Sequence, residues 1–256
     1  MTVLILQARV DSHRLPGKSL LPLGGEPLVF RVMEALGAVP CDLRVLACPE
    51  DAADFFLPLA KRGGFELYRG PKEDVLGRYC GAIGRFFPNP GGDSSRVIRA
   101  TADNPFVFAD AAAAIAQESA ALGADYGGYA GLPLGAGVEA VSAAALLRAG
   151  EEADRGDERE HVCPYLYTHP NLFRLHRPLA PRPWQDNPLR PLRLTVDTPE
   201  DYHRAQDLYG NLLAAAKEER HLGRVIMEAA DPPVRSAGGS AGGLRGTEPA
   251  LYRFWE

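Results

Sequence analysis

Three positively charged side chains lie close together near the start of the chain: Arg9, Arg14 and Lys18. Lysine and arginine neutralise the charges of phosphate groups, and Gly17 would let the backbone approach a phosphate closely. Scattered charges in a solvated loop would explain the cations alone equally well. The full pattern R-x-x-S-x-R-L-P-G-K over residues 9–18 is more specific, and it lacks the spacing of a Walker A loop.

Two aspartates far apart in the sequence are candidate metal ligands. Asp103 follows an apolar run at residues 96–100, and Asp197 follows another at residues 192–196. If both runs are parallel strands, the two carboxylates reach the same edge of the sheet, where the cationic loop also lies. Mg²⁺ prefers one or two carboxylates together with phosphate oxygens and water. Taken singly, Asp103 is equally explained by a turn and Asp197 by a helix cap.

The elements that must position these residues alternate along the chain. Short apolar runs predict strands, and amphipathic segments between them predict helices, with Pro58 expected to end or kink one of them. This alternation predicts a three-layer α/β fold with a mostly parallel sheet and helices on both faces. Strands are expected at residues 3–6, 43–48, 65–68, 96–100, 138–142, 172–176 and 192–196. Helices are expected from Pro27 past Leu36, and at 52–62, 74–87, 109–122, 143–154 and 198–216.

Composition restricts the class of protein. The 256 residues carry a net charge of −5, which argues against general binding to nucleic acid or to anionic membranes. No apolar stretch is long enough to span a membrane, and the first residues do not read as a signal peptide, so a cytoplasmic protein is expected. The four cysteines contain no C-x-x-C pair.

The chain divides into two parts by composition. Residues 1–230 are expected to form one large globular domain, because α/β folds often reach this length as a single unit. Residues 231–256 contain Pro232-Pro233 and a Gly/Ser-rich stretch, which predicts a flexible tail.

Several ordered motifs, spread over residues 3–212, resemble one family. They are the loop at residues 9–18, LLPLGGEPL at 20–28, RG at 69–70 with EDVL at 73–76 and RY at 78–79, EREHV at 158–162, and TVDTPED at 195–201. They are similar to the cytidylyltransferases that make CMP-activated sugars. The branch they resemble most is called spore-coat polysaccharide biosynthesis protein F, which is related to the CMP-3-deoxy-manno-octulosonate synthetases.

This resemblance implies an activity, a cofactor and partners. The expected enzyme is an Mg²⁺-dependent nucleotidyltransferase with a nucleotide-diphospho-sugar transferase-like, Rossmann-like fold. It would transfer CMP from CTP to a sugar or sugar-like acceptor, release pyrophosphate and serve cell-surface polysaccharide biosynthesis. The resemblance also suggests a homodimer. The resemblance assigns Asp103 and Asp197 to the metal, and Lys18, Arg14 and Asp103 to catalysis. The expected nucleotide-binding residues are Leu6, Gln7, Ala8, Arg9, Ser12, Arg14, Lys18, Arg78, Thr101 and Ala102.

The acceptor side of the resemblance is weaker. Glu139, Glu160 and His161 match positions near the acceptor, although isolated or clustered charges are more often solvated. Where the family pattern resembles P-D-G-x-D-V-E, this chain has Leu134 and Gly137 in place of two aspartates. The identity of the acceptor therefore stays open.

Two other functions remain possible from the sequence. One is a glycosyltransferase that uses a finished nucleotide-sugar, but such enzymes often hold their metal with Asp-x-Asp, which this chain lacks. The other is a nucleotide-binding protein without catalysis, which the altered acceptor motif keeps open.

Overall fold

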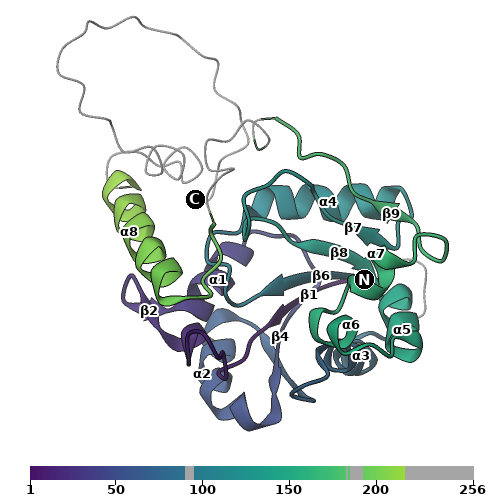
Figure 1. The fold of residues 1–256 in the computed structure, drawn as a ribbon, viewed down its shortest axis with the longest axis horizontal. Coiled ribbons are helices and arrows are strands. Elements are labelled where there is room, and N and C mark those ends of the chain that lie inside the picture. Colours follow the sequence, from purple (N-terminus) through teal and green to yellow (C-terminus); the bar gives the residue numbers. More distant parts are fainter. Residues whose placement is uncertain (90–94, 183, 185–192, 217–256) are drawn as a thin grey trace, which may run out of the picture.

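A computed structural model of the chain describes residues 1–89, 95–182, 184 and 193–216 (Figure 1). The tail expected at residues 231–256 lies outside the described residues, as does the end of the 1–230 domain. Within the described part, no helix combines the length and the apolar character that crossing a membrane requires.

Seven strands form the central sheet, and six of them run in the same direction. Across the sheet the order is β5 (Glu66–Gly70), β4 (Leu43–Pro49), β1 (Thr2–Gln7), β6 (Arg96–Thr101), β8 (Glu139–Ser142), β7 (Tyr126–Gly127) and β9 (Leu175–His176). The central strand β1 pairs in parallel with β4 and β6, whereas β8 is antiparallel to both of its neighbours. The predicted mostly parallel sheet is confirmed.

Helices cover both faces of this sheet. Side chains along a strand alternate between its two faces, so a strand that is apolar throughout must be covered on both. In β1, Leu4 and Leu6 pack into one core, and Val3 and Ile5 into the other. The first core lies under α1 (Leu28–Leu36), α2 (Ala53–Gly63), α4 (Ala109–Ala121) and α8 (Pro199–Ala216). The second lies under α3 (Val75–Phe86), α5 (Ala143–Glu152) and α7 (Pro164–Thr168), with α6 (Gly156–His161) beside them (Figure 1). The three-layer prediction is confirmed.

Helix ends follow the local sequence signals. Asp74 caps α3 by accepting a hydrogen bond from the N–H of Gly77 at 2.8 Å. Pro27 immediately precedes α1, as expected. Pro58 lies inside α2, which continues past it to Gly63, so the proline does not end the helix.

The expected strand at residues 192–196 is wrong. Residue 192 lies outside the described residues, and the rest makes only an isolated bridge between Arg193 and Leu134. Its apolar side chains, Leu194 and Val196, are buried in the core, which explains the strand-like sequence pattern. The backbone N–H groups of these two residues donate to the carbonyls of Leu134 and Asp103, both at 2.8 Å, and not to a sheet strand.

Smaller differences concern the irregular parts of the chain. The strand expected at 172–176 is shorter, since β9 contains only Leu175–His176. Two short strands that the sequence did not predict, β2 (Pro22–Leu23) and β3 (Glu26–Pro27), form an antiparallel pair before α1.

Candidate active site

The cationic loop folds back on itself after β1. The N–H of Gly17 donates to the carbonyl of Val10 at 2.9 Å, and the Ser19 hydroxyl donates to the carbonyl of Arg9 at 3.0 Å. Gly17 has a φ of 67°, a left-handed conformation that glycine adopts without steric cost. The short helix η1 (Lys18–Leu20) follows at once. This path turns Lys18 inward, so that only 6% of the residue is exposed.

Asp103 is oriented by the turn that follows β6. Its Oδ1 accepts a hydrogen bond from the Thr101 hydroxyl at 2.6 Å, and Thr101 in turn accepts one from the Asn104 amide at 2.9 Å. The N–H of Ala102 donates to the carbonyl of Gln7 at 2.9 Å. The ends of β6 and β1 are therefore fixed to each other, and Asp103 faces the cationic loop.

Asp197 is positioned by the start of α8. Thr198 caps the helix by accepting from the N–H of Asp201 at 3.2 Å, and Asp201 accepts from the N–H groups of Asp197 and Thr198, both at 3.1 Å. This reciprocal arrangement is a capping box with aspartate in the acidic position. The predicted start of the helix at Thr198–Pro199 is confirmed. Capping, and not a preceding strand, holds Asp197 in place.

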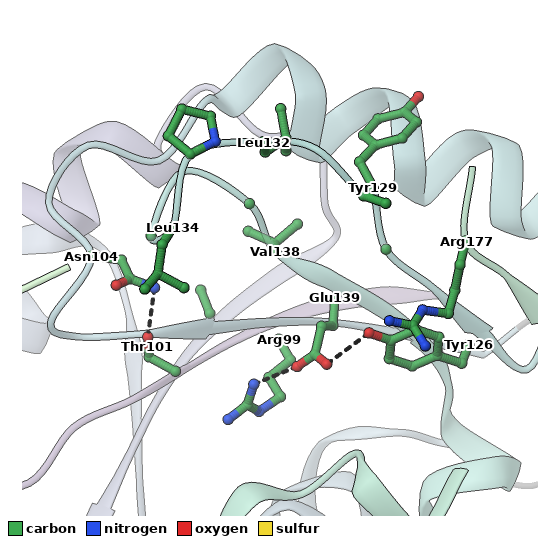
Figure 2. Close-up of a pocket in the computed structure, with 16 residues that line it drawn as sticks. Arg99, Thr101, Asn104, Tyr126, Tyr129, Leu132, Leu134, Val138, Glu139 and Arg177 are labelled. Carbon is green, nitrogen blue, oxygen red and sulfur yellow. Dashed lines mark hydrogen bonds and ion pairs between the residues drawn. The ribbon is translucent and has the colours of Figure 1, made fainter. Parts of the chain in front are cut away.

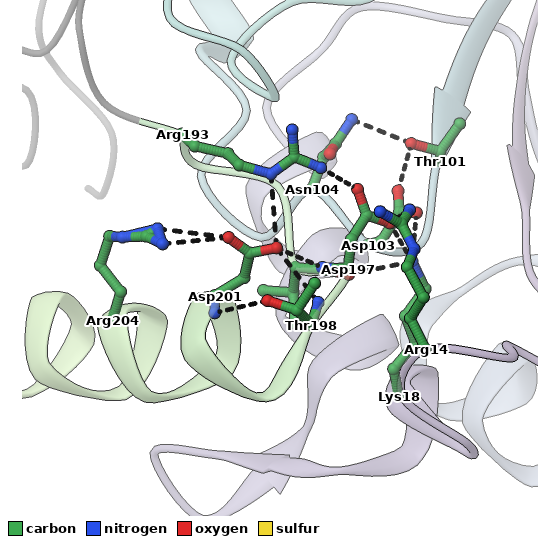
Figure 3. Close-up of polar contacts among 11 residues, drawn as sticks. Arg14, Lys18, Thr101, Asp103, Asn104, Arg193, Asp197, Thr198, Asp201 and Arg204 are labelled. Atoms are coloured by element: carbon green, nitrogen blue, oxygen red, sulfur yellow. Dashed lines mark hydrogen bonds and ion pairs between the residues drawn. The ribbon is translucent and has the colours of Figure 1, made fainter.

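The Lys18 ammonium lies between the two aspartates (Figure 3). Its Nζ is 2.7 Å from Asp103 Oδ2, 2.7 Å from Asp197 Oδ1 and 2.9 Å from the Val196 carbonyl oxygen. The predicted metal ligands thus converge on one point. Among the described residues, no group of three or more histidine, cysteine, aspartate or glutamate side chains could hold a metal ion. Two carboxylates fit Mg²⁺ only if phosphate and water oxygens complete its coordination.

Cations surround Asp197. The Arg14 guanidinium lies 3.4 Å from Asp197 Oδ1, and Arg193 pairs with Asp197 Oδ2. Burial alone would raise the pKa of Asp197, but the hydrogen bond from Lys18 and the charges of Lys18, Arg14 and Arg193 outweigh it. The pKa of Asp197 therefore lies below its ordinary value, and the carboxylate stays charged.

A pocket of about 350 Å³ opens beside this cluster. It brings together nearly all the residues that the sequence predicted for the nucleotide and the metal. They are Gln7, Ala8, Arg9, Ser12, Arg14, Lys18, Arg78, Thr101, Ala102, Asp103 and Asp197. Leu6 is the exception: it is fully buried in the core under α1 and does not line the pocket.

Arg78 is a buried cation that faces this pocket. It is 1% exposed, and among the described residues its Nε and Nη1 have no hydrogen-bond partner. Burial lowers the pKa of the guanidinium, but arginine remains charged at neutral pH. Burying an unpaired charge costs free energy of folding. A ligand that presents an anionic group or a carbonyl oxygen to Arg78 would offset this cost.

A second pocket, of about 370 Å³, lies next to the first. Arg99 and Thr101 line both pockets. Figure 2 shows Leu134 near Asn104 and Thr101 at one end, and Arg177 near Tyr126 and Glu139 at the other. The two positions where this chain departs from the family pattern, Leu134 and Gly137, both line this second pocket.

Comparisons with known proteins identify the family of this chain. A family model described as cytidylyltransferase matches residues 3–227. The chain belongs to the cytidylyltransferase family. It is 35% identical over 212 residues to the spore coat polysaccharide biosynthesis protein SpsF of Bacillus subtilis (strain 168), covering 80% of this chain and 85% of that protein.

Solved structures share the fold of this cytidylyltransferase. A cytidylyltransferase from Leptospira borgpetersenii superposes with a TM-score of 0.70 at 22% identity, covering 88% of this chain and 96% of that one. The CMP:2-keto-3-deoxy-manno-octonic acid synthetase complexed with CTP gives a TM-score of 0.60 at 14% identity, covering 85% and 99%. The nucleotide-diphospho-sugar transferase-like fold is confirmed.

The residues predicted for the acceptor separate in the structure of the cytidylyltransferase. Glu139 lines the second pocket, whereas Glu160 and His161 line the first. Glu160 lies 3.6 Å from the Arg9 guanidinium. The neighbouring Arg159 has a structural role, because it donates to Asp74 and thereby joins α6 to the start of α3.

The sequence analysis did not identify three arginines of the candidate site. Arg99 lies inside an otherwise buried strand, which is a detectable signal for a functional arginine. Arg193 and Arg177 lie in irregular segments, and no local pattern identifies them. Arg193 contacts Asp197 and Asp201, and Arg177 faces the second pocket.

Proposed function

We propose that this cytidylyltransferase binds CTP in the first pocket and transfers CMP to an acceptor in the second. The observation that carries the proposal is that the two pockets adjoin, because Arg99 and Thr101 line both of them. A donor and an acceptor held in adjoining pockets are close enough to react, which is the main advantage of positioning.

The cationic residues of the first pocket fit the charges of a triphosphate. Lys18 and Arg14 would contact the phosphates, and Arg78 would donate a hydrogen bond to an oxygen of the nucleotide. The exposed main chain around Ala8 and Arg9 would meet the ribose or the base. The Arg14 side chain is 65% exposed, so it is free to move toward the ligand. The Lys18 side chain is buried and held in place by its partners.

The reaction follows from this placement. An acceptor oxygen attacks the α-phosphorus, a new P–O bond forms, and the bond between that phosphorus and the oxygen bridging to the β-phosphate breaks. Pyrophosphate leaves with the electron pair, and a hydroxyl acceptor loses its proton to solvent or to a neighbouring base. Lys18 and Arg14 stabilise the charge that develops on the phosphates, which is the largest contribution in such transfers.

Asp103 and Asp197 are the residues that would hold a magnesium ion. When bound, the ion would supply charge neutralisation at the phosphates. Lys18 already bridges both carboxylates, so the protein keeps the pair together before the nucleotide binds. Thr101 and the capping box of α8 then hold the two side chains in the orientation described above.

The names of similar proteins favour CTP and a sugar acceptor. One relative is named for spore coat polysaccharide biosynthesis, and one protein of the same fold is a CMP-sugar-acid synthetase complexed with CTP. We extend to this chain the use of CTP and a place in polysaccharide biosynthesis. Homodimerisation stays a prediction.

Calorimetric titration with CTP, UTP, ATP and GTP tests the proposal, first with Mg²⁺ and then with EDTA. Binding of CTP that depends on Mg²⁺, followed by acceptor-dependent pyrophosphate release, is the expected result. If no triphosphate binds, the assignment of the first pocket is wrong. If triphosphates bind but only a nucleotide-sugar is turned over, the protein is a glycosyltransferase.

A further inference from the structure

The second pocket has an unbalanced charge. Glu139 is the acidic residue among the described residues that line it, and both of its oxygens have partners. Glu139 Oε2 pairs with Arg99, and Oε1 accepts a hydrogen bond from the Tyr126 hydroxyl at 2.9 Å. Arg99 and Glu139 therefore cancel each other, and Arg177 remains as an excess positive charge.

Arg177 is exposed, and its position leaves it available to a ligand. Its guanidinium lies 5.6 Å from the centre of the Tyr167 ring, and within the described ranges no carboxylate pairs with it. Figure 2 shows it at the end of the pocket formed by Tyr126 and Glu139, away from Thr101 and the nucleotide side. A planar guanidinium with free donors binds carboxylate or phosphoryl oxygens well.

Three apolar side chains lie along the pocket between these two ends. Leu132, Leu134 and Val138 line it, and Figure 2 shows Val138 between Leu134 and the Glu139 end of the pocket. Leu134 is 57% exposed, so its side chain does not serve the core. The backbone next to it packs closely against residue 195. A Cβ added at Gly135 would lie only 2.6 Å from the Thr195 backbone nitrogen. The loop is thus held against the segment that leads to Asp197.

We propose that the second pocket selects an acceptor that is poor in hydroxyl groups: one carboxylate or phosphoryl group binds Arg177, and an apolar segment lies against Leu132, Leu134 and Val138. This inference rests on the proposed function, because it takes the second pocket as the acceptor site. Hydroxyls of a sugar that face these three side chains would be left unpaired, and unpaired polar groups oppose binding. The reacting oxygen would lie at the other end, beside Thr101.

Small probes can measure this preference directly. We would titrate the protein with butyrate, propylphosphonate, butyramide and glucuronate by ligand-observed NMR. Each titration is run without nucleotide, and again with Mg²⁺ and a non-hydrolysable α,β-methylene analogue of CTP. Butyrate or propylphosphonate is expected to bind at least ~10-fold more tightly than neutral butyramide, the scale of a hydrogen bond to a charged group. Butyrate is expected to bind more tightly than hydroxyl-rich glucuronate.

Two variants locate the interaction. Arg177→Gln should weaken binding of the anionic probes by ~10-fold or more, and leave butyramide unchanged. Leu134→Asp should weaken butyrate by ~3-fold or more, through lost apolar contact and added repulsion. The matched control is Arg85→Gln, because Arg85 is also exposed and lies 5.8 Å from the centre of an aromatic ring, that of Phe86. The control should bind every probe as the wild type does.

The outcomes separate this inference from the proposed function. Equal binding of butyrate and butyramide, no saturable binding of either anion, or unchanged binding in Arg177→Gln would overturn the inference. If the CTP analogue fails to bind, the proposed function fails, while the titrations without nucleotide still report on the pocket. Turnover of a neutral, hydroxyl-rich acceptor by an enzyme that binds CTP would support the proposed function and reject this acceptor class.

Discussion

The Lys18 ammonium lies 2.7 Å from Asp197 Oδ1, although 179 positions separate the two residues in the sequence. The same ammonium is 2.7 Å from Asp103 Oδ2. One buried cation therefore holds two carboxylates from different parts of the fold at a single point. This relationship makes Lys18 both a support for the two carboxylates and a candidate contact for the phosphates.

Replacing Lys18 with methionine separates these two roles. Turnover, measured as pyrophosphate release, should fall by ~10²-fold or more, because one contact to transition-state charge is lost. Without nucleotide, the two carboxylates lose their shared cation, so calorimetry should show tighter binding of Mn²⁺. Lys61→Met, an exposed substitution on α2, is the control and should change neither value. Near-normal turnover in Lys18→Met would reject the assigned role.

Neutralising the aspartates should change the dependence on metal. Asp103→Asn and Asp197→Asn each remove one negatively charged candidate ligand, and should raise the Mg²⁺ concentration needed for half-maximal pyrophosphate release. Affinity losses of about 10- to 100-fold accompany changes in the surroundings of metal ligands, so the shift should be at least that large. The exposed Asp54→Asn on α2 is the control. Unchanged Mg²⁺ titrations in both variants would contradict a metal role.

Arg78→Met should move stability and binding in opposite directions. Because two nitrogens of this buried guanidinium have no hydrogen-bond partner, methionine removes an unpaired charge and should maintain or raise the Tm. The Kd for CTP should rise by ~10-fold or more, as expected when a charged hydrogen bond is lost. Thermal unfolding and calorimetry on the same sample measure both quantities. A large fall in Tm together with unchanged CTP binding would show that Arg78 is structural.

Acid should destabilise the start of α8. Burial opposes ionisation of Asp201, but hydrogen bonds from the Asp197 and Thr198 N–H groups and the Arg193 charge outweigh it and hold its pKa below the ordinary value of 3.8. A depressed folded-state pKa gives stability that is complete above the unfolded-state value and is lost as the pH falls through the folded-state value. The Tm should therefore decline as the pH falls below about 4.

Asp201→Asn tests this origin of acid sensitivity. At neutral pH the variant should lose about 1–2 kcal/mol, the usual scale for a helix cap. Its Tm should then fall less than that of the wild type between pH 5 and 3. Asp157→Asn serves as the control, since Asp157 pairs with Arg155 on the surface. Parallel pH profiles for the wild type and Asp201→Asn would assign the acid sensitivity to other carboxylates.

The sequence predicted those parts of the fold that depend on local chemistry. Short apolar runs identified β1, β4, β5 and β6, and the Thr198–Pro199 signal identified the start of α8. The segment at 192–196 was wrongly predicted as a strand because its alternate side chains are buried in the core, as those of a strand are. Its backbone partners, Leu134 and Asp103, are distant in sequence, and no local pattern reveals them.

The sequence alone also determined the family and most residues of the first pocket, because the cationic loop and the aspartates occur in recognisable local motifs. Only the tertiary structure decided that Lys18 lies between Asp103 and Asp197, that Arg78 is buried without a full set of partners in the described part of the chain, and that Arg99 lines both pockets. The physical reason is that pairing and burial depend on contacts between segments distant along the chain. Residue types and short spacings specify chemistry and local structure, whereas long-range packing determines which charges meet and which remain free.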